Sequence, residues 1–105
     1  MSQQSLYLEE VIGDIGQVEM LEQGLALFQT VGMPARNLSA RTREEYTNDL
    51  TDLIAFLSKR GKTKLVETWL SDLEAYQAEM DRRNYEGTTR KRKTYAIKTW
   101  FTYLH

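Results

Sequence analysis

The 105-residue chain lacks the side chains on which several kinds of catalytic and metal site depend. It has no cysteine, and its single histidine, His105, is the last residue. A zinc-type ligand set is therefore excluded, and so is a nucleophilic site built on a thiol or a histidine. We expect no catalytic residue, no metal and no cofactor in this chain.

Long apolar runs and targeting signals are missing as well. No stretch approaches the roughly eighteen consecutive apolar residues that a membrane span needs, and the first residues do not have the pattern of a signal peptide. Together with the lack of cysteine, which fits a reducing compartment, this predicts a cytoplasmic protein with no membrane partner. The length is typical of one domain that needs no disulfide.

The chain has one proline, and the alternation of apolar and polar residues that is typical of a β-strand is absent. The only proline, Pro34, lies close to Gly32, and the segment 31–37 is predicted to be a connector that breaks the helix before it. Apolar residues three and four positions apart predict helices over 16–30, 42–60, part of 65–83 and 88–104. We predict an all-α fold, a four-helix orthogonal bundle over 17–105, preceded by a loosely ordered acidic leader over 1–16.

The helix ends carry their own signals. Thr42 is predicted to cap the second helix, with Glu45 reaching back to it, and Gly61 to end that helix in a left-handed conformation. The third helix is expected to turn Val66, Trp69, Leu70, Leu73, Tyr76 or Gln77, and Met80 toward the core. Four acidic residues, Asp49, Asp52, Asp72 and Glu74, are interpreted as exposed helix positions with partners one turn away.

Charge is unevenly distributed along the chain, although the net charge is only −1. Residues 1–38 contain five acidic residues and one basic residue, Arg36, whereas the remaining residues contain ten acidic and thirteen basic ones. The local field of a cluster, and not the sum over the molecule, decides whether a polyanion binds. The carboxyl-terminal two thirds are therefore the region to search for a phosphate site.

The most informative cluster follows Gly87, where Thr88 or Thr89 is predicted to cap a helix with four basic residues in its first turn. Cations are unfavourable near the positive end of a helix dipole unless an anion such as phosphate binds there. A second helix beginning resembles the first. The candidate DNA-binding residues are Arg41, Thr42, Arg43, Thr89, Arg90, Lys91, Arg92 and Lys93. A solvated basic turn without a ligand is the alternative.

Taken in order, several positions resemble a known family. They are Ser39, Thr42, Tyr46, Asp49-Leu50, Leu53, Phe56-Leu57, Gly61, Asp72-Leu73-Glu74-Ala75-Tyr76, and then Thr89, Arg92, Ala96-Ile97-Lys98, Trp100-Phe101 and Tyr103-Leu104. With these spacings the stretch from about Val18 to Leu104 is similar to the amino-terminal core-binding domain of tyrosine recombinases and phage integrases.

The resemblance implies a four-helix, SAM-like bundle that forms one half of a C-shaped clamp around a recombination core site. Such a domain binds double-stranded DNA without cutting it, because the family's catalytic residues belong to a separate carboxy-terminal domain. The implied partners are DNA, that catalytic domain in a longer parent chain, and protomers of the same recombinase. The family's DNA-facing positions carry over onto Thr42, Arg43, Thr89, Arg92 and Lys93, while Glu86 departs from the Ser that the family often has there.

One alternative from another class remains. The chain is also consistent with a helical protein-interaction module that has no DNA role. Its docking surface would be the acidic stretch 1–38 or aromatic residues away from the apolar stripe of the last helix, Tyr95 and Tyr103.

Overall fold

The computed structural model describes residues 18–105, and the leader expected over 1–16 lies outside these residues. The described part of the chain is helical. Its elements are α2 (Leu21–Leu27), a π-helical turn (Phe28–Gly32), α3 (Met33–Ala35), α4 (Ala40–Lys59), a 3-10 turn (Leu65–Glu67), α5 (Leu70–Arg82) and α6 (Gly87–Leu104). Within this range the only extended pairing is an isolated bridge between Met20 and Lys64. The all-α prediction is confirmed.

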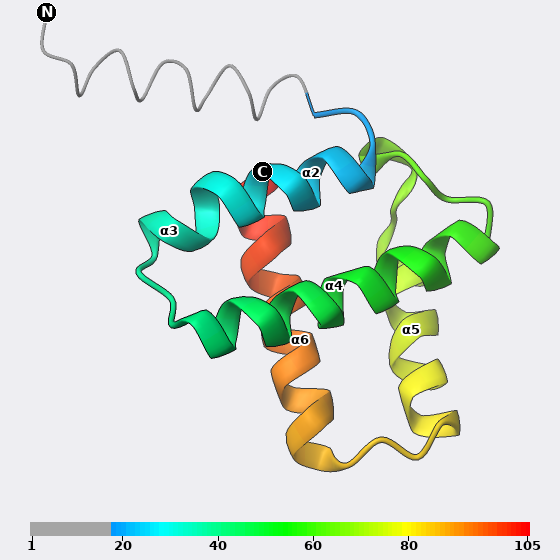
Figure 1. Ribbon diagram of the computed structural model, residues 1–105. Coiled ribbons are helices and arrows are strands. Elements are labelled where there is room, and N and C mark those ends of the chain that lie inside the picture. The colour runs from blue at the N-terminus through cyan, green and yellow to red at the C-terminus, as the bar shows by residue number, and fades with distance from the viewer. Residues whose placement is uncertain (1–17) are drawn as a thin grey trace, which may run out of the picture.

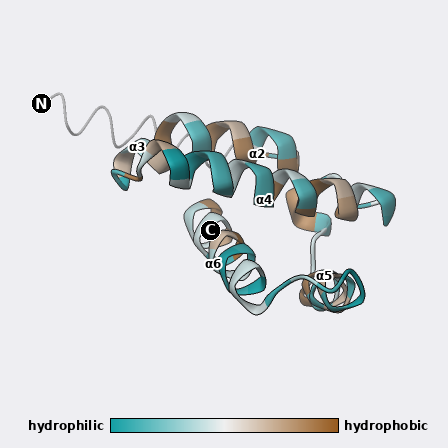
Figure 2. Cartoon of the chain, turned by 60° about the horizontal axis from the view of Figure 1, so that its bottom comes forward, coloured by the Kyte–Doolittle hydropathy of each residue, from teal (hydrophilic) through white to brown (hydrophobic). Residues whose placement is uncertain are grey.

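The helices cross at steep angles and form two layers. The continuous helix α2–α3 runs beside α4, and α6 passes behind α4 so that its carboxyl-terminal end reaches α2 (Figure 1). In the second view α2 and α4 lie on one side, with α5 and α6 on the other (Figure 2). Helix α6 is therefore the element that connects the two layers.

The core lies where α2, α4 and α6 meet. Trp100 is its largest fully buried side chain, and Phe28 packs against Tyr103 with 5.4 Å between ring centroids. The buried apolar residues are Leu21, Phe28, Met33, Tyr46, Leu50, Leu53, Leu57, Tyr76, Met80, Ala96, Ile97, Trp100 and Leu104. These residues include most of the apolar stripes that the sequence spacing predicted.

The connector predicted at 31–37 is wrong, because the first helix continues to Ala35. The backbone N–H of Met33 donates to the carbonyl of Phe28, five residues back, which makes a π turn. After this turn Pro34 lies at the first turn of α3, where a missing N–H costs little. Gly32 allows the Phe28 ring to pack closely against the backbone, since a Cβ at position 32 would lie 2.4 Å from Cδ1 of Phe28. The helix ends before Asn37, which has a φ of 52°.

The predicted beginnings of two helices need correction. Ser39 caps α4, because its Oγ accepts the backbone N–H of Thr42 at 3.1 Å, so Thr42 lies inside the first turn and is not the cap. Helix α6 is capped two to three residues earlier than expected, at Glu86 instead of Thr88 or Thr89, which places the basic cluster beyond the first three helical positions. The predicted left-handed end of α4 is confirmed, since Gly61 has a φ of 78°.

The third helix begins at Leu70, after a 3-10 turn, so the first residues predicted for its inner face are not buried. Val66, Trp69 and Leu70 are 80%, 66% and 71% exposed. The reason is tertiary, because Leu65 donates its backbone N–H to the carbonyl of Glu19 at 2.9 Å and holds this segment against the chain that precedes α2. Further along α5, Tyr76 and Met80 are buried as predicted.

Candidate nucleic-acid interface

A buried carboxylate marks the point where α4 and α6 cross. Asp49 accepts hydrogen bonds from Nε and Nη2 of Arg92 at 2.9 and 2.8 Å, and its Oδ1 lies 3.2 Å from Nζ of Lys93. The interpretation of Asp49 as an exposed residue is wrong, because its position beside Leu50 turns it toward α6. A buried carboxylate needs opposite charges, and the basic cluster supplies two.

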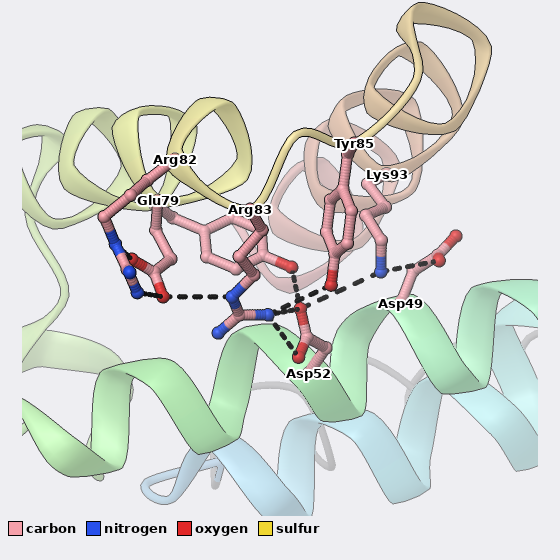
Figure 3. A network of polar contacts seen from close by, with 8 residues as sticks. Asp49, Asp52, Glu79, Arg82, Arg83, Tyr85 and Lys93 are labelled. Carbon is pink, nitrogen blue, oxygen red and sulfur yellow. Dashed lines mark hydrogen bonds and ion pairs between the residues drawn. The ribbon is translucent and has the colours of Figure 1, made fainter.

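A second carboxylate extends this contact to α5. Asp52 accepts hydrogen bonds from the Tyr76 hydroxyl and from Nη1 of Arg83 at 3.1 Å, and its Oδ2 lies 3.8 Å from Nζ of Lys93 (Figure 3). Burial alone would raise the pKa of Asp52, but these hydrogen bonds and the nearby cations hold it below its usual value. Burial and the bond to Asp52 raise the pKa of Tyr76. Asp52 is therefore half-buried and bonds to Tyr76 and Arg83, which are far from it in sequence. The interpretation of Asp52 as an exposed residue with partners one turn away on the same helix is wrong.

Asp72 is also buried, contrary to the expectation of an exposed position. Its Oδ2 accepts the backbone N–H of Trp69 at 3.0 Å, and its Oδ1 accepts from Nε of Arg60 at 3.1 Å. These interactions, the backbone bond first, lower the pKa of Asp72. The carboxylate thus fixes the start of α5, and both of its oxygens are engaged within the domain.

The predicted residues at the start of α4 are accessible. The Arg41 side chain is 89% exposed and forms an ion pair with Glu45 at 3.1 Å. Nε of Arg43 donates to the carbonyl of Leu38 at 2.9 Å, which holds one edge of the guanidinium at the helix start. The Thr42 hydroxyl is hydrogen-bonded to Oγ of Ser39 at 2.9 Å.

The predicted residues at the start of α6 fall into two groups. Thr89, Arg90 and Lys91 reach the surface, and Arg90 lies 3.3 Å from Asp81. Arg92 is 36% exposed and its pKa is raised by the hydrogen bonds to Asp49. The side chain of Lys93 is only 9% exposed, and its Nζ lies 5.3 Å from the ring centroid of Tyr85. Lys93 lies four residues before Ile97, on the same face as the apolar stripe of α6, and this spacing was the available signal that it would be buried.

The two helix beginnings both lie on the amino-terminal side of the crossing of α4 and α6. Thr42 precedes Asp49 by about two helical turns, and Thr89 precedes Arg92 by about one. The contact of Asp49 with Arg92 fixes how the two ends are placed. In Figure 1 α4 begins at the left, below α3, and α6 begins at the bottom, so the two helix beginnings extend from the crossing in different directions.

A surface hollow beside this crossing brings the candidates Arg90 and Lys91 together with Gln77, Thr94 and Lys98, which were not predicted as site residues. It has a volume of about 380 Å³ and is lined by Gln77, Arg90, Lys91, Thr94, Tyr95 and Lys98. Tyr95 is 63% exposed and lies 6.4 Å from Tyr46 between ring centroids. Its position off the apolar stripe was the available signal. Tyr103, assigned to the same class, instead packs on Phe28.

Residues 18–105 contain no group of three or more His, Asp or Glu side chains placed to hold a metal ion. None of the helices in this range is long and apolar enough to cross a membrane.

The chain matches the family model described as "Phage integrase, N-terminal SAM-like domain" over residues 27–105. It therefore belongs to this family, which forms the amino-terminal domain of tyrosine recombinases. The resemblance noted from the sequence is confirmed. No solved structure matches the chain.

Curated relatives carry the names of whole recombinases. Tyrosine recombinase XerC of Listeria monocytogenes is 30% identical over 69 residues, covering 66% of this chain and 23% of the relative. Tyrosine recombinase XerD of Agrobacterium fabrum is 30% identical over 70 residues, covering 67% and 21%. XerD of Vibrio cholerae is 31% identical over 70 residues, covering 67% and 23%. The chain thus matches less than a quarter of the length of each relative.

Proposed function

We propose that this domain binds the backbone of double-stranded DNA at a recombination site and takes no part in the chemistry. The observation that supports it most is the crossing of α4 and α6, where two helix beginnings with accessible cations flank Asp49. Backbone N–H groups and long basic side chains at helix beginnings are common partners of phosphate. Membership of the phage-integrase family agrees with a role in recombination.

The eight candidate residues take different roles in this proposal. Arg41, Arg43, Thr89, Arg90 and Lys91 contact phosphates directly, because their polar groups reach solvent in the unbound domain. Arg92 offers phosphate its exposed edge while Asp49 holds the other one. Thr42 and Lys93 act mainly by shaping the two helix beginnings, since the former bonds to Ser39 and the latter to Asp49.

The proposal extends to the parent protein. The relatives are whole recombinases, so we propose that the chain is the DNA-holding part of a cytoplasmic site-specific tyrosine recombinase. A separate carboxy-terminal domain would carry the catalytic residues. Clamping between two domains raises affinity through effective concentration, so the isolated domain is expected to bind more weakly than the full protein. Protomers of the same recombinase would assemble on the DNA.

The first test is the salt dependence of binding to a short duplex. If about five phosphates are contacted, the logarithm of affinity falls against the logarithm of salt concentration with a slope of roughly −4 to −5. The double variant Arg41→Ala/Lys91→Ala should weaken binding and reduce the slope by about 2. Lys59→Ala is the matched control, because Lys59 lies at the opposite end of α4. A slope near zero would reject the proposal.

The protein-interaction alternative is tested by following amide signals during a duplex titration. DNA binding through the proposed surface should shift the signals of residues 41–47 and 88–94 together. Shifts confined to other residues would contradict the assignment. Unchanged signals at millimolar duplex in low salt would favour a module with no DNA role.

A further inference from the structure

The exposed face of α6 carries an aromatic ring among basic side chains. Tyr95 is 63% exposed and lines the surface hollow of about 380 Å³ beside the α4–α6 crossing. Within residues 18–105 three basic side chains line the same hollow, Arg90, Lys91 and Lys98, and no acidic one does. The hollow therefore combines positive charge with an accessible ring, a combination that is common where proteins bind nucleic acids.

The acidic residues near the hollow compensate only part of its charge. Arg90 lies 3.3 Å from Asp81, whose side chain is 79% exposed, and Lys98 also lines the neighbouring hollow together with Glu74. Lys91 is exposed and forms no ion pair within the described part of the chain. An anion that enters the hollow therefore meets net positive charge.

Tyr95 lies at the α4–α6 crossing, on the side on which α4 begins. Its ring centroid is 6.4 Å from that of the buried Tyr46, which lies about one turn before Asp49 on α4. The domain thus supports one side of the Tyr95 ring, and the Tyr95 hydroxyl forms no hydrogen bond within residues 18–105. A supported aromatic side chain offers contact area at low entropic cost, which is typical of residues that dominate binding surfaces.

Two lysines flank Tyr95 along α6. Lys91 precedes it by four residues and Lys98 follows it by three, so the three side chains lie on one face of the helix. The two lysines are separated by about 10 Å along the helix axis. The major groove of B-DNA is about 12 Å wide and admits an α-helix. When this face enters the groove, the long lysine side chains can reach phosphates while the ring between them meets the edges of the bases.

We propose that Tyr95 reads the DNA sequence by packing its ring on the methyl group of thymine, while Lys91 and Lys98 hold phosphates on either side of it. This inference rests on the proposed function, because it requires the domain to bind duplex DNA. Phosphate contacts position a protein on DNA, whereas contacts with base edges, including apolar contacts with the thymine methyl group, give specificity. Tyr95 is then a specificity-determining residue, and the eight candidate residues position the domain.

Two pairs of short duplexes of equal length isolate the methyl group. Alternating A·T and A·U duplexes differ only in that group, and alternating G·C duplexes with and without 5-methylcytosine give the same comparison in another sequence. The chain should bind the methylated member of each pair about fourfold more tightly, the effect of burying one methyl-sized group. Tyr95→Ala should bind both members equally. Tyr95→Phe, which keeps the ring, should retain the difference.

The flanking contact is tested on the same duplexes. Lys98→Ala should weaken binding to all of them alike and reduce the slope of log affinity against log salt by about 1. Lys59→Ala, at the opposite end of α4 from the helix beginning, is the matched control and should change neither. An unchanged slope in Lys98→Ala would overturn the placement of this face on DNA.

The outcomes separate this inference from the proposed function. Equal affinity of the parent chain for both members of each pair, or a difference that persists in Tyr95→Ala, would overturn the role of Tyr95 while salt-dependent DNA binding stands. Binding to no duplex, or binding that does not depend on salt, would reject both.

Discussion

Removing the Asp49 carboxylate should destabilise the domain strongly, because two cations at the α4–α6 crossing depend on it. In Asp49→Ala, Lys93 would stay buried with its Nζ 3.8 Å from Asp52 as the nearest remaining carboxylate contact. Arg92 would lose both of its hydrogen bonds but could still reach water, since its side chain is 36% exposed.

The expected magnitude follows from this difference. Breaking a buried ion pair by removing one partner typically costs 3 to 5 kcal/mol, and the partial exposure of Arg92 together with Asp52 lowers that figure, so we expect about 2 to 4 kcal/mol. Asp81→Ala is the matched control. Asp81 is 79% exposed and pairs with Arg90 at 3.3 Å, so its loss should change the free energy of unfolding by about 0.5 kcal/mol or less.

Urea denaturation followed by circular dichroism measures both variants, and the shift of the midpoint at constant slope gives the difference. The double variant Asp49→Leu/Lys93→Met should recover much of the loss, because a buried ion pair can be replaced by apolar side chains of similar volume. If Asp49→Ala cost no more than Asp81→Ala, the carboxylate would not be holding the crossing together, and our reading of the α6 cations would fail.

Three further substitutions test other parts of the structure. Trp100→Ala should lower the free energy of unfolding by about 3 to 5 kcal/mol, measured by urea denaturation, because the side chain is fully buried. Gly32→Ala should lower the free energy of unfolding by about 1 to 3 kcal/mol, seen as a lower melting temperature, because the new methyl group would meet the Phe28 ring. Gly87→Ala is the control and should be tolerated, because a methyl group there meets no atom within 4 Å. The lowered pKa of Asp72 means that its stabilisation is complete above the unfolded pKa of about 3.9 and is lost as the pH falls through the folded pKa. Asp72→Asn should therefore flatten the loss of stability between about pH 5 and pH 2, measured by urea denaturation at each pH; an unchanged slope would contradict the assigned interactions.

The helices could be predicted where their apolar stripes are uninterrupted. Leu50, Leu53 and Leu57 in α4, and Ile97, Trp100 and Leu104 in α6, recur at helical spacing and are all buried. Such periodicity reports on one helix at a time. It cannot show that Leu65 pairs with Glu19, a contact between segments far apart in sequence, and the expected burial of Val66 and Trp69 failed for that reason.

The predicted cluster of cations was found, but its electrostatic partner was not predicted. Tyr46, Asp49, Leu50 and Leu53 are spaced by three, one and three, so Asp49 shares the face of the apolar residues. That position, taken with the basic residues of the last helix, was a signal for a buried ion pair. This ion pair was not predicted, because charged residues were taken to be solvated by default. Whether the eight candidate residues contact DNA remains a prediction.

The π turn determines which side of the first helix faces the core. Phe28 and Met33 are five residues apart and both buried, although in an α-helix such a pair would be about 140° apart around the axis. The additional residue in the turn brings them to the same side. Deleting one residue between positions 29 and 31 would restore ordinary helical spacing and rotate Leu21 and Gly24 by about 100° relative to Met33. The amino-terminal helix should therefore tolerate changes of its outer side chains far better than any change in its length.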